Sequence, residues 1–415
     1  MLDASKLHAE QTPSRLRISF VEFVGLTAAL MALTALSIDI MLPALPAIGT
    51  ALGVESDNDR QKVIILYMAG FAAGQLIYGP LSDRYGRKPV LLGGLALFVL
   101  GSLGALISNS FDTLLAARLV QGLGAASPRV VAIAVVRDLY EGRQMARVMS
   151  LAMMVFILIP VLAPSLGQAL LHFGDWHLMF YALLVMGAVV ALWAGLRLPE
   201  TSRQALGEEQ AWTLGHSFKA AVFEPQTIGY GVAGGLMFGC LLAYVASAQQ
   251  IFAGVFDQGE AFPVLFGAVA SVMAVASFVN ARLVGRLGMR RVSHRALAAY
   301  VGVAALLTAA AHGGMATLPV FSLLVAALFF LFGLIAPNFN ALAMEPQGHN
   351  AGMASSVIGS ISTAVGALAG GLIGSAFDGT VLPLALGFAG CSLLTSALVF
   401  AIEGPAGLFG RNRPR

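Results

Sequence analysis

The sequence predicts an all-α integral membrane protein in which twelve transmembrane helices form two six-helix pseudo-repeats. Three observations lead to this prediction. Of the 415 residues, 58% are hydrophobic and only 11% are charged, whereas ordinary soluble domains carry about 25% charged residues. Apolar runs long enough to cross about 30 Å of hydrocarbon recur along the whole chain. The longest polar interruption divides these runs six and six. The composition excludes a soluble enzyme, a nucleic-acid-binding protein and a disordered scaffold.

Each span is expected where about 20 mostly apolar residues follow one another. The expected spans are 19–46, 61–80, 90–108, 112–136, 147–171, 177–197, 224–252, 261–282, 295–311, 317–343, 351–375 and 382–402. They predict a cytoplasmic segment 1–17, a first bundle 18–198, a cytoplasmic central loop 199–223, a second bundle 224–403 and a cytoplasmic tail 404–415.

The lysines and arginines predict the orientation, because cytoplasmic loops carry an excess of them. Twenty of the 24 basic residues fall in the two terminal segments and in the gaps that follow every second span. Only Arg60 and Lys62 fall on the other side, and Arg118 and Arg129 lie inside the fourth span. Both termini are therefore expected in the cytoplasm. The cations are spread along the chain, so they do not form a nucleic-acid-binding patch.

A weak internal repeat supports the division into halves. Residues 81–88 align with residues 283–290 at an offset of 202, with matching Leu, Arg and Gly positions. Both segments follow the second span of their half. Parallel repeats of this kind build several transporter folds, although a chance match is the alternative.

Asp39 is the principal functional candidate. It lies well inside the first span, where a carboxylate costs about 2.5–3.5 kcal/mol on insertion scales. Such a group is neutralised, paired or turned toward a wet cavity, which suits a side chain that takes up and releases a proton. The alternative is that Asp39 simply reaches water near Pro43. Glu22 lies about 25 Å away along the same helix and is expected at the interface.

Arg118 lies inside the fourth span and cannot lose its proton, so it must face carbonyls, a carboxylate or water. We expect it to modulate a proton-binding carboxylate such as Asp39. A purely structural bond to backbone carbonyls is the alternative. Arg129 lies nearer the cytoplasmic end of the span and is expected to snorkel.

The segment 79–89 is expected to be a charged turn that gates the cytoplasmic face. Its glycines permit a tight backbone, and its aspartate can attract a helix N-terminus or pair with an arginine. Bonds of this kind hold one conformational state and break in the other. The gating residues are Gly79, Asp83, Arg84, Gly86, Arg87 and Lys88.

At this point the motifs resemble a known family. Residues 79–89 resemble the loop signature of the major facilitator superfamily, and Arg118 with Gln121 and Gly122 is similar to its helix-4 signature. Residues 160–167 resemble the drug:proton antiporter signature, and residues 39–46 are similar to the start of Bcr/CflA-type exporters, the relatives of bicyclomycin and chloramphenicol resistance carriers. The resemblance covers the whole chain and is concentrated in residues 36–167. It implies export of small hydrophobic drugs in exchange for protons.

The antiporter signature places a functional bend at Pro160, Pro164 and Gly167, for which an ordinary kink is the alternative. Two positions depart from the expected patterns. Gln168 stands where the antiporter signature usually has a second glycine. Gly285 stands where the first-half loop has Asp83, so we expect gating charge in the first half only.

A promiscuous drug cavity needs apolar and aromatic walls with a few polar groups. Seven side chains in the predicted spans are candidates for this wall: Tyr67, Gln75, Gln121, Tyr244, Gln249, Phe330 and Asn338.

The predicted function is therefore a proton-driven exporter of small hydrophobic or amphiphilic drugs in a bacterial inner membrane, working as a monomer without cofactor or metal. A carrier of a small metabolite on the same fold is the alternative. An intramembrane enzyme is disfavoured because no His pair with metal-ligand spacing and no buried Asp pair is present. A channel is disfavoured because the sequence has no repeated pore loop. Direct use of ATP is disfavoured because the sequence has no phosphate-binding loop.

Overall fold

The structure is a computed structural model that describes residues 18–140, 142–202, 218–347 and 351–408. Within these residues, twelve helices are long and apolar enough to cross a membrane, as the sequence predicts. The expected N-terminal segment 1–17, residues 203–217 of the expected central loop and residues 409–415 of the expected tail lie outside the described residues. The chain is a multi-pass membrane protein.

Six spans make up the first half. Its first span is broken, because Pro43 and Pro46 cannot continue a helix from its interior and instead begin new short turns. The elements are α1 (Phe20–Asp39), η1 (Leu42–Ala44), α2 (Leu45–Ala51), η2 (Asp57–Gln61), α3 (Lys62–Tyr85), α4 (Arg87–Leu106), α5 (Phe111–Leu139), α6 (Gly142–Phe173) and α7 (His177–Arg197).

Six further spans make up the second half. Its first helix ends in a π-helical segment, a form that is rare in proteins and frequent at functional sites. The elements are α9 (Pro225–Gln249), η4 (Gln250–Val255), α10 (Phe262–Leu287), α11 (Met289–His312), α12 (Leu318–Met344), η5 (Glu345–Gln347), α13 (Ala351–Ser375) and α14 (Leu382–Leu408).

The expected loops between spans 2 and 3 and between spans 8 and 9 are much shorter than the sequence suggests. Helix α3 continues to Tyr85 and α4 begins at Arg87, so the loop is reduced to Gly86 at φ 99°. Gly288 at φ 83° separates α10 from α11 in the same way. The expected spans 61–80 and 261–282 ended too early, because the helices continue after the hydrophobic stretch ends. Gly86 and Gly288 are themselves 202 residues apart, the offset of the sequence repeat.

All of the predicted gating residues except Gly86 consequently lie on helices rather than in a loop. Gly79, Asp83 and Arg84 belong to the last turns of α3, whereas Arg87 and Lys88 are the first residues of α4. We call the end of the bundle that carries the Gly86 and Gly288 turns the basic face, and the other end the opposite face.

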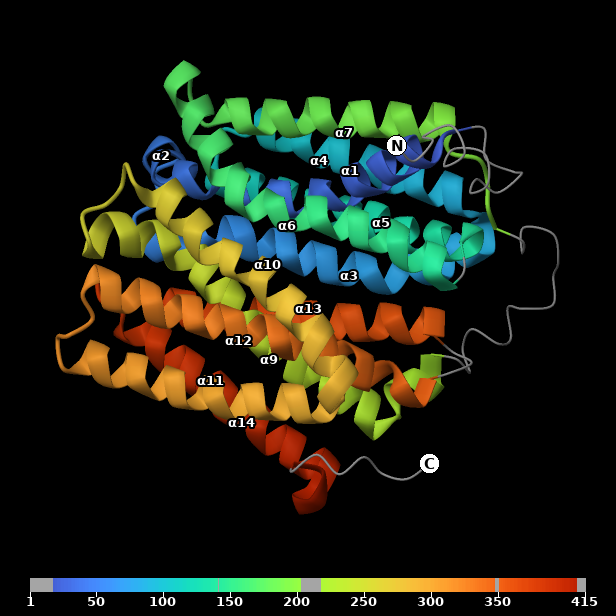
Figure 1. The fold of residues 1–415 in the computed structure, drawn as a ribbon. Helices are drawn as coiled ribbons and strands as arrows, with labels where there is room; N and C mark the ends of the chain where they lie inside the picture. The colour runs from blue at the N-terminus through green and yellow to red at the C-terminus, as the bar shows by residue number, and fades with distance from the viewer. Residues whose placement is uncertain (1–17, 141, 203–217, 348–350, 409–415) are drawn as a thin grey trace, which may run out of the picture.

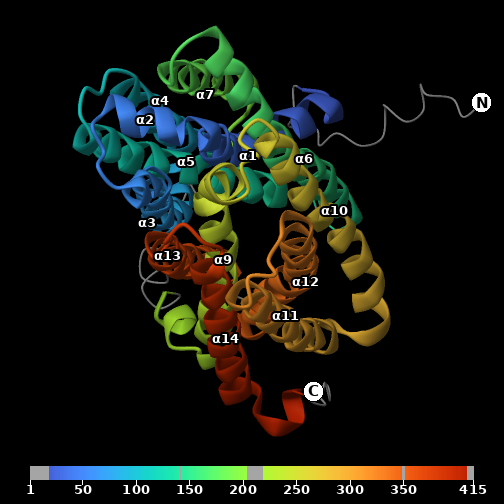
Figure 2. The same ribbon diagram turned by 90° about the vertical axis from the view of Figure 1, so that its left-hand side faces the viewer.

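The two halves lie side by side and meet along two seams. Figure 1 shows the first half, α1 to α7, above the second half, α9 to α14, with the helices running between the two faces. In the end-on view of Figure 2, α3 lies beside α13 and α6 beside α10. Along the first seam, Ser360 Oγ donates to the Ala72 carbonyl at 2.8 Å, and Gln75 Nε2 donates to Thr363 Oγ1 at 2.7 Å.

Three amide side chains join the halves at the opposite face, and we call them the amide cluster: Asn58, Gln61 and Gln250. Asn58 Nδ2 donates to the carbonyls of Ser375 and Phe377 at 3.0 and 2.8 Å. Gln61 Nε2 donates to Gln250 Oε1 at 2.7 Å, and Gln250 Nε2 donates to Asn58 Oδ1 at 3.3 Å. Hydrogen bonds between uncharged side chains and carbonyls therefore link the two halves at the opposite face.

Replacing Gly86 by alanine tests the single-residue turn. Gly86→Ala places a Cβ in a backbone conformation that only glycine adopts readily, and 2.7 Å from Glu200 Oε2. We expect it to destabilise the protein by about 1–3 kcal/mol, measured as a lowered thermal unfolding midpoint in detergent. Gly285→Ala is the matched control, because a Cβ there meets open space on a helix. Equal midpoints for the two variants would contradict the turn assignment.

Candidate functional site

Asp39 is the last residue of α1, directly before the proline-containing break of the first span. Its side chain is buried, with 5% exposure. Among the described residues, no side chain or backbone group forms a hydrogen bond or ion pair with its carboxyl group. A carboxyl group in such surroundings costs less free energy when it carries a proton than when it is ionised. Glu22, at the other end of α1, is instead paired with Arg197 at 2.6 Å.

Arg118 on α5 holds the end of α1 in place. A helix leaves its last carbonyls without intrahelical partners, and here Met41 N–H bonds to Ile38 instead of Ser37. The free Ser37 carbonyl accepts a hydrogen bond from Arg118 Nη2 at 3.0 Å, a favourable place for a cation at a helix C-terminus.

The remaining bonds of Arg118 tie this helix end to two more helices. Its Nε donates to the Val63 carbonyl of α3 at 3.0 Å, and its Nη1 donates to Gln121 Oε1. Gln121 Nε2 in turn donates a hydrogen bond to Ser102 Oγ of α4 at 2.7 Å. The guanidinium group also lies 4.4 Å from the centre of the Tyr67 ring. Arg118 forms no ion pair with Asp39; it positions the turn that begins two residues before the acid.

Helix α6 connects the Asp39 turn to the other half of the protein. Gly167 lies against this turn so closely that a Cβ would be 2.1 Å from the Ile40 carbonyl oxygen and 2.9 Å from Pro43 Cγ. One to two turns earlier, the Val161 carbonyl approaches Gly267 of α10. Pro160 and Pro164 lie in this part of α6. Pro164 has no backbone N–H, so the carbonyl four residues before it lacks its usual helical hydrogen bond. The prolines for which a bend was predicted therefore lie in the part of α6 that contacts both the Asp39 turn and α10.

Some of the predicted first-half gating residues take part in a charged network around Arg87. Its guanidinium group pairs with Asp83 and, at 2.9 Å, with Asp138 of α5. Glu200 accepts bonds from the backbone N–H groups of Arg87 and Lys88 at 2.8 and 3.1 Å, which caps the N-terminus of α4 with a negative charge. Sequence reasoning missed Asp138 and Glu200.

The other gating residues lie outside this network. Arg84 is exposed beside the Tyr85 ring, with 5.3 Å between its guanidinium carbon and the ring centre. Gly79 faces the second half, since a Cβ there would be 2.3 Å from Ser356 Oγ of α13.

The second half carries a corresponding network, which corrects the expectation that gating charge belongs to the first half only. Arg290 pairs with Glu345 at 2.7 Å and with Glu403 at 2.8 Å. Tyr230 donates a further hydrogen bond to Glu403 at 2.8 Å. Arg290 lies 203 residues after Arg87, and Glu403 lies 203 residues after Glu200. The loss of the aspartate at Gly285 is offset by Glu345 of η5 and Glu403 of α14.

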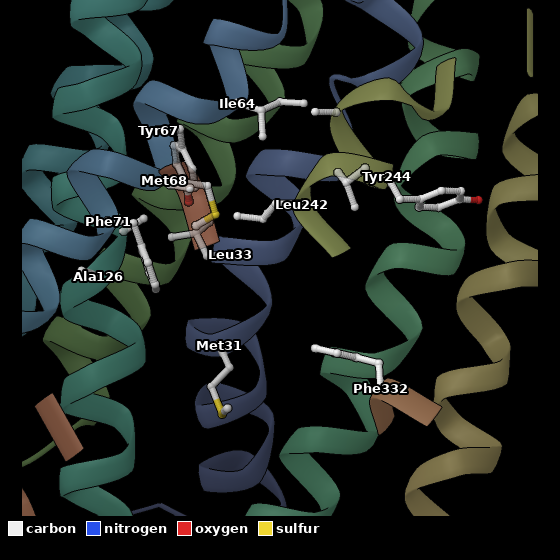
Figure 3. Packing of buried hydrophobic residues seen from close by; sticks show 14 of the residues in the cluster. Met31, Leu33, Ile64, Tyr67, Met68, Phe71, Ala126, Leu242, Tyr244 and Phe332 are labelled. Atoms are coloured by element: carbon white, nitrogen blue, oxygen red, sulfur yellow. The ribbon is translucent and has the colours of Figure 1, made fainter. Parts of the chain in front are cut away.

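The seven predicted cavity residues do not gather at one place. Tyr67 and Gln121 belong to the Arg118 network, Gln75 lies in the seam, and Asn338 bonds to Asn280 at 2.7 Å. Figure 3 shows Tyr67 and Tyr244 on different helices, with the Tyr244 ring pointing away from Leu33 and Leu242. Tyr244 packs in an aromatic cluster, with ring centres 4.9 Å from Phe329 and 5.5 Å from Phe266. Gln249 and Phe330 are half-buried.

Comparison with known proteins identifies the family. The model of the family described as "Major Facilitator Superfamily" matches residues 27–371, which is most of the chain. The chain belongs to the Major Facilitator Superfamily. Members of this superfamily are transporters, in agreement with the twelve spans and the parallel six-helix repeat.

Relatives within the superfamily include named resistance proteins. The chain is 31% identical to the bicyclomycin resistance protein homolog of Haemophilus influenzae over 86% of its own length and 90% of the relative's. It is 31% identical to the multidrug resistance protein MdtL of Shewanella oneidensis over 80% and 83% of the two chains. Among solved structures, the xylose transporter XylE from E. coli matches with a TM-score of 0.70 at 12% identity, covering 93% of this chain and 97% of that one, and supports the fold alone.

Replacing Gly167 tests its contact with the Asp39 turn. Gly167→Ala requires α6 or the Ile40 backbone to move, because no flexible side chain separates the two backbones. We expect this overpacking to destabilise the protein by about 1–3 kcal/mol, measured as a lowered thermal midpoint. Gly302→Ala on α11 is the control, since a Cβ there meets nothing within 4 Å. If both variants melt like the parent, α6 does not press against this turn.

Proposed function

We propose that this chain exports small hydrophobic or amphiphilic drugs in exchange for protons by alternating access. The observation that carries the proposal is the buried carboxyl group of Asp39, which has no partner among the described residues. Relatives named for bicyclomycin and multidrug resistance support the substrate class. The proton gradient supplies the energy, and neither a cofactor nor a metal takes part.

Asp39 acts in this scheme as the proton carrier. Protonation from outside makes the group neutral and releases the drug outward. Loss of the proton to the inside leaves a carboxylate, which restores affinity for the drug. Because burial penalises the ionised form, the ionised state favours an arrangement in which water or substrate reaches Asp39. Movement of the Asp39 turn is transmitted through Gly167 and Val161 of α6 to Gly267 of α10.

We further propose that the protein lies in a bacterial inner membrane with both termini in the cytoplasm. The excess of lysine and arginine at the basic face supports this orientation. The amide cluster then lies on the periplasmic side, and the structure corresponds to a state closed toward the periplasm. One chain supplies Asp39, Arg118 and both charged networks, so we propose the monomer as the working unit.

The decisive variant is Asp39→Asn, which cannot bind and release a proton at this position. We expect it to abolish drug-driven proton movement in vesicles that contain the purified protein, recorded with a pH-sensitive dye inside the vesicles. Glu260→Gln is the matched control, because Glu260 is an exposed acid near the opposite face. It should transport like the parent.

Two outcomes would contradict the proposal. Unchanged proton movement by Asp39→Asn, at equal amounts of folded protein, would remove Asp39 from the coupling. Drug movement without any proton movement in the parent protein would identify facilitated diffusion rather than exchange.

A further inference from the structure

Helix α10 carries an exposed stripe that changes from apolar to basic as it approaches the basic face. Val275 and Phe278 are 58% and 59% exposed, and Arg282 and Arg286 follow at helical spacing and are also exposed. Residues three and four apart share one face of a helix, so these four side chains form a continuous line. We call them, together with Arg295 of α11, the α10 stripe.

The arginines of the α10 stripe have no acidic partner among the described residues. None of the described carboxylates forms a salt bridge with Arg282, Arg286 or Arg295, whereas the neighbouring Arg290 is paired with two. No acidic residue occurs anywhere between positions 282 and 295. The guanidinium group of Arg282 lies 3.9 Å from the centre of the Phe278 ring. Stacking of this kind orients a guanidinium group and leaves its N–H groups available.

The internal repeat shows that two of these arginines are not part of the shared gating device. Positions 202 residues before Arg282 and Arg295 are occupied by Pro80 and Gly93. Arg290, by contrast, aligns with Lys88 at this offset, so that position is basic in both halves. The extra cations are therefore a feature of the second half alone, beyond what the fold requires.

We propose that the α10 stripe binds the headgroup of an anionic phospholipid, with an acyl chain lying along Val275 and Phe278. Arg282 lies about 7.5 Å before the end of α10, and Arg295 lies about 9 Å after the start of α11. Both cations are thus about one and a half turns inside the helix ends, at a similar depth. Arginine binds phosphate oxygens through two parallel N–H bonds, and basic sites between helices at this level bind anionic headgroups.

The order of the side chains favours a phospholipid over a soluble anion. A soluble phosphate needs only the arginines, and would gain nothing from the two large apolar side chains beside them. A phospholipid places its phosphate at the arginines and its acyl chain toward the bilayer centre, which is the order found along α10. The expected occupant is a glycerophospholipid with net negative charge, such as phosphatidylglycerol.

The test measures thermal unfolding of the full-length protein in a neutral detergent. Phosphatidylglycerol is expected to raise the midpoint of the parent by about 3–5 °C, as a ligand well above its dissociation constant does. Phosphatidylcholine and inorganic phosphate at equal concentration should give less than a third of that shift. The triple variant Arg282→Gln, Arg286→Gln, Arg295→Gln should lose the difference between the two lipids.

A matched variant separates a built site from general surface charge. Replacing Arg411, Arg413 and Arg415 of the tail by glutamine removes the same number of cations and should leave the phosphatidylglycerol shift intact. Phe278→Ser should reduce it while keeping every charge. Equal loss of the shift in the tail variant, an equal shift with inorganic phosphate, or no lipid dependence of the parent would each overturn the proposal.

A second measurement tests the proposal even if the triple variant does not fold. In the parent protein alone, 1 M NaCl shortens the screening length to about 3 Å and should abolish at least two thirds of the phosphatidylglycerol shift. A shift that is insensitive to salt would contradict headgroup recognition by arginines. None of these measurements depends on transport, so they distinguish failure of this site from failure of the proposed exchange function.

Discussion

The structure depends on how one broken helix end is stabilised inside the bundle. Helix α1 stops at Asp39 because prolines follow, and its end exposes carbonyls where water is scarce. Arg118 satisfies the Ser37 carbonyl and at the same time the Val63 carbonyl of α3. This use of the cation leaves Asp39 without a counter-charge. An arginine that paired with Asp39 instead would keep it ionised and would make it a poor proton carrier.

The charged networks at the basic face act within each half rather than between the halves. Arg87 is bonded to first-half residues and Arg290 to second-half residues. The described contacts between the halves at this face include Gly79 against Ser356 and the Arg137 guanidinium group against Gly352, and neither is an ion pair. The two halves can therefore separate here without breaking these ion pairs. Each network lies beside one of the tight turns, at Gly86 or at Gly288, and links helices of its own half.

The sequence predicted the number of spans and the two halves, because hydrophobic length and a repeated motif can be counted directly along the chain. It also led to Asp39, Arg118 and Gly167 individually. It did not predict that Gly167 lies against the Asp39 turn, because that contact joins residues more than a hundred positions apart. The predicted cavity residues lie at separate places for the same reason: an aromatic or amide in a span has the same local pattern in a seam, a core cluster or a cavity. The acids Asp138, Glu200, Glu345 and Glu403 were missed because the positive-inside rule counts cations only.

The chemistry of the two faces differs in a way that bears on proton coupling. The two halves are linked at the opposite face by the amide cluster, whose side chains carry no charge at any physiological pH. Its strength is therefore independent of the proton concentration on either side. A gate of carboxylates at this face would open or close with the external pH, whatever the state of Asp39. Because these amides do not titrate, protons cannot open or close this contact by binding to the amide cluster, and among the described residues Asp39 is the buried acid without a partner.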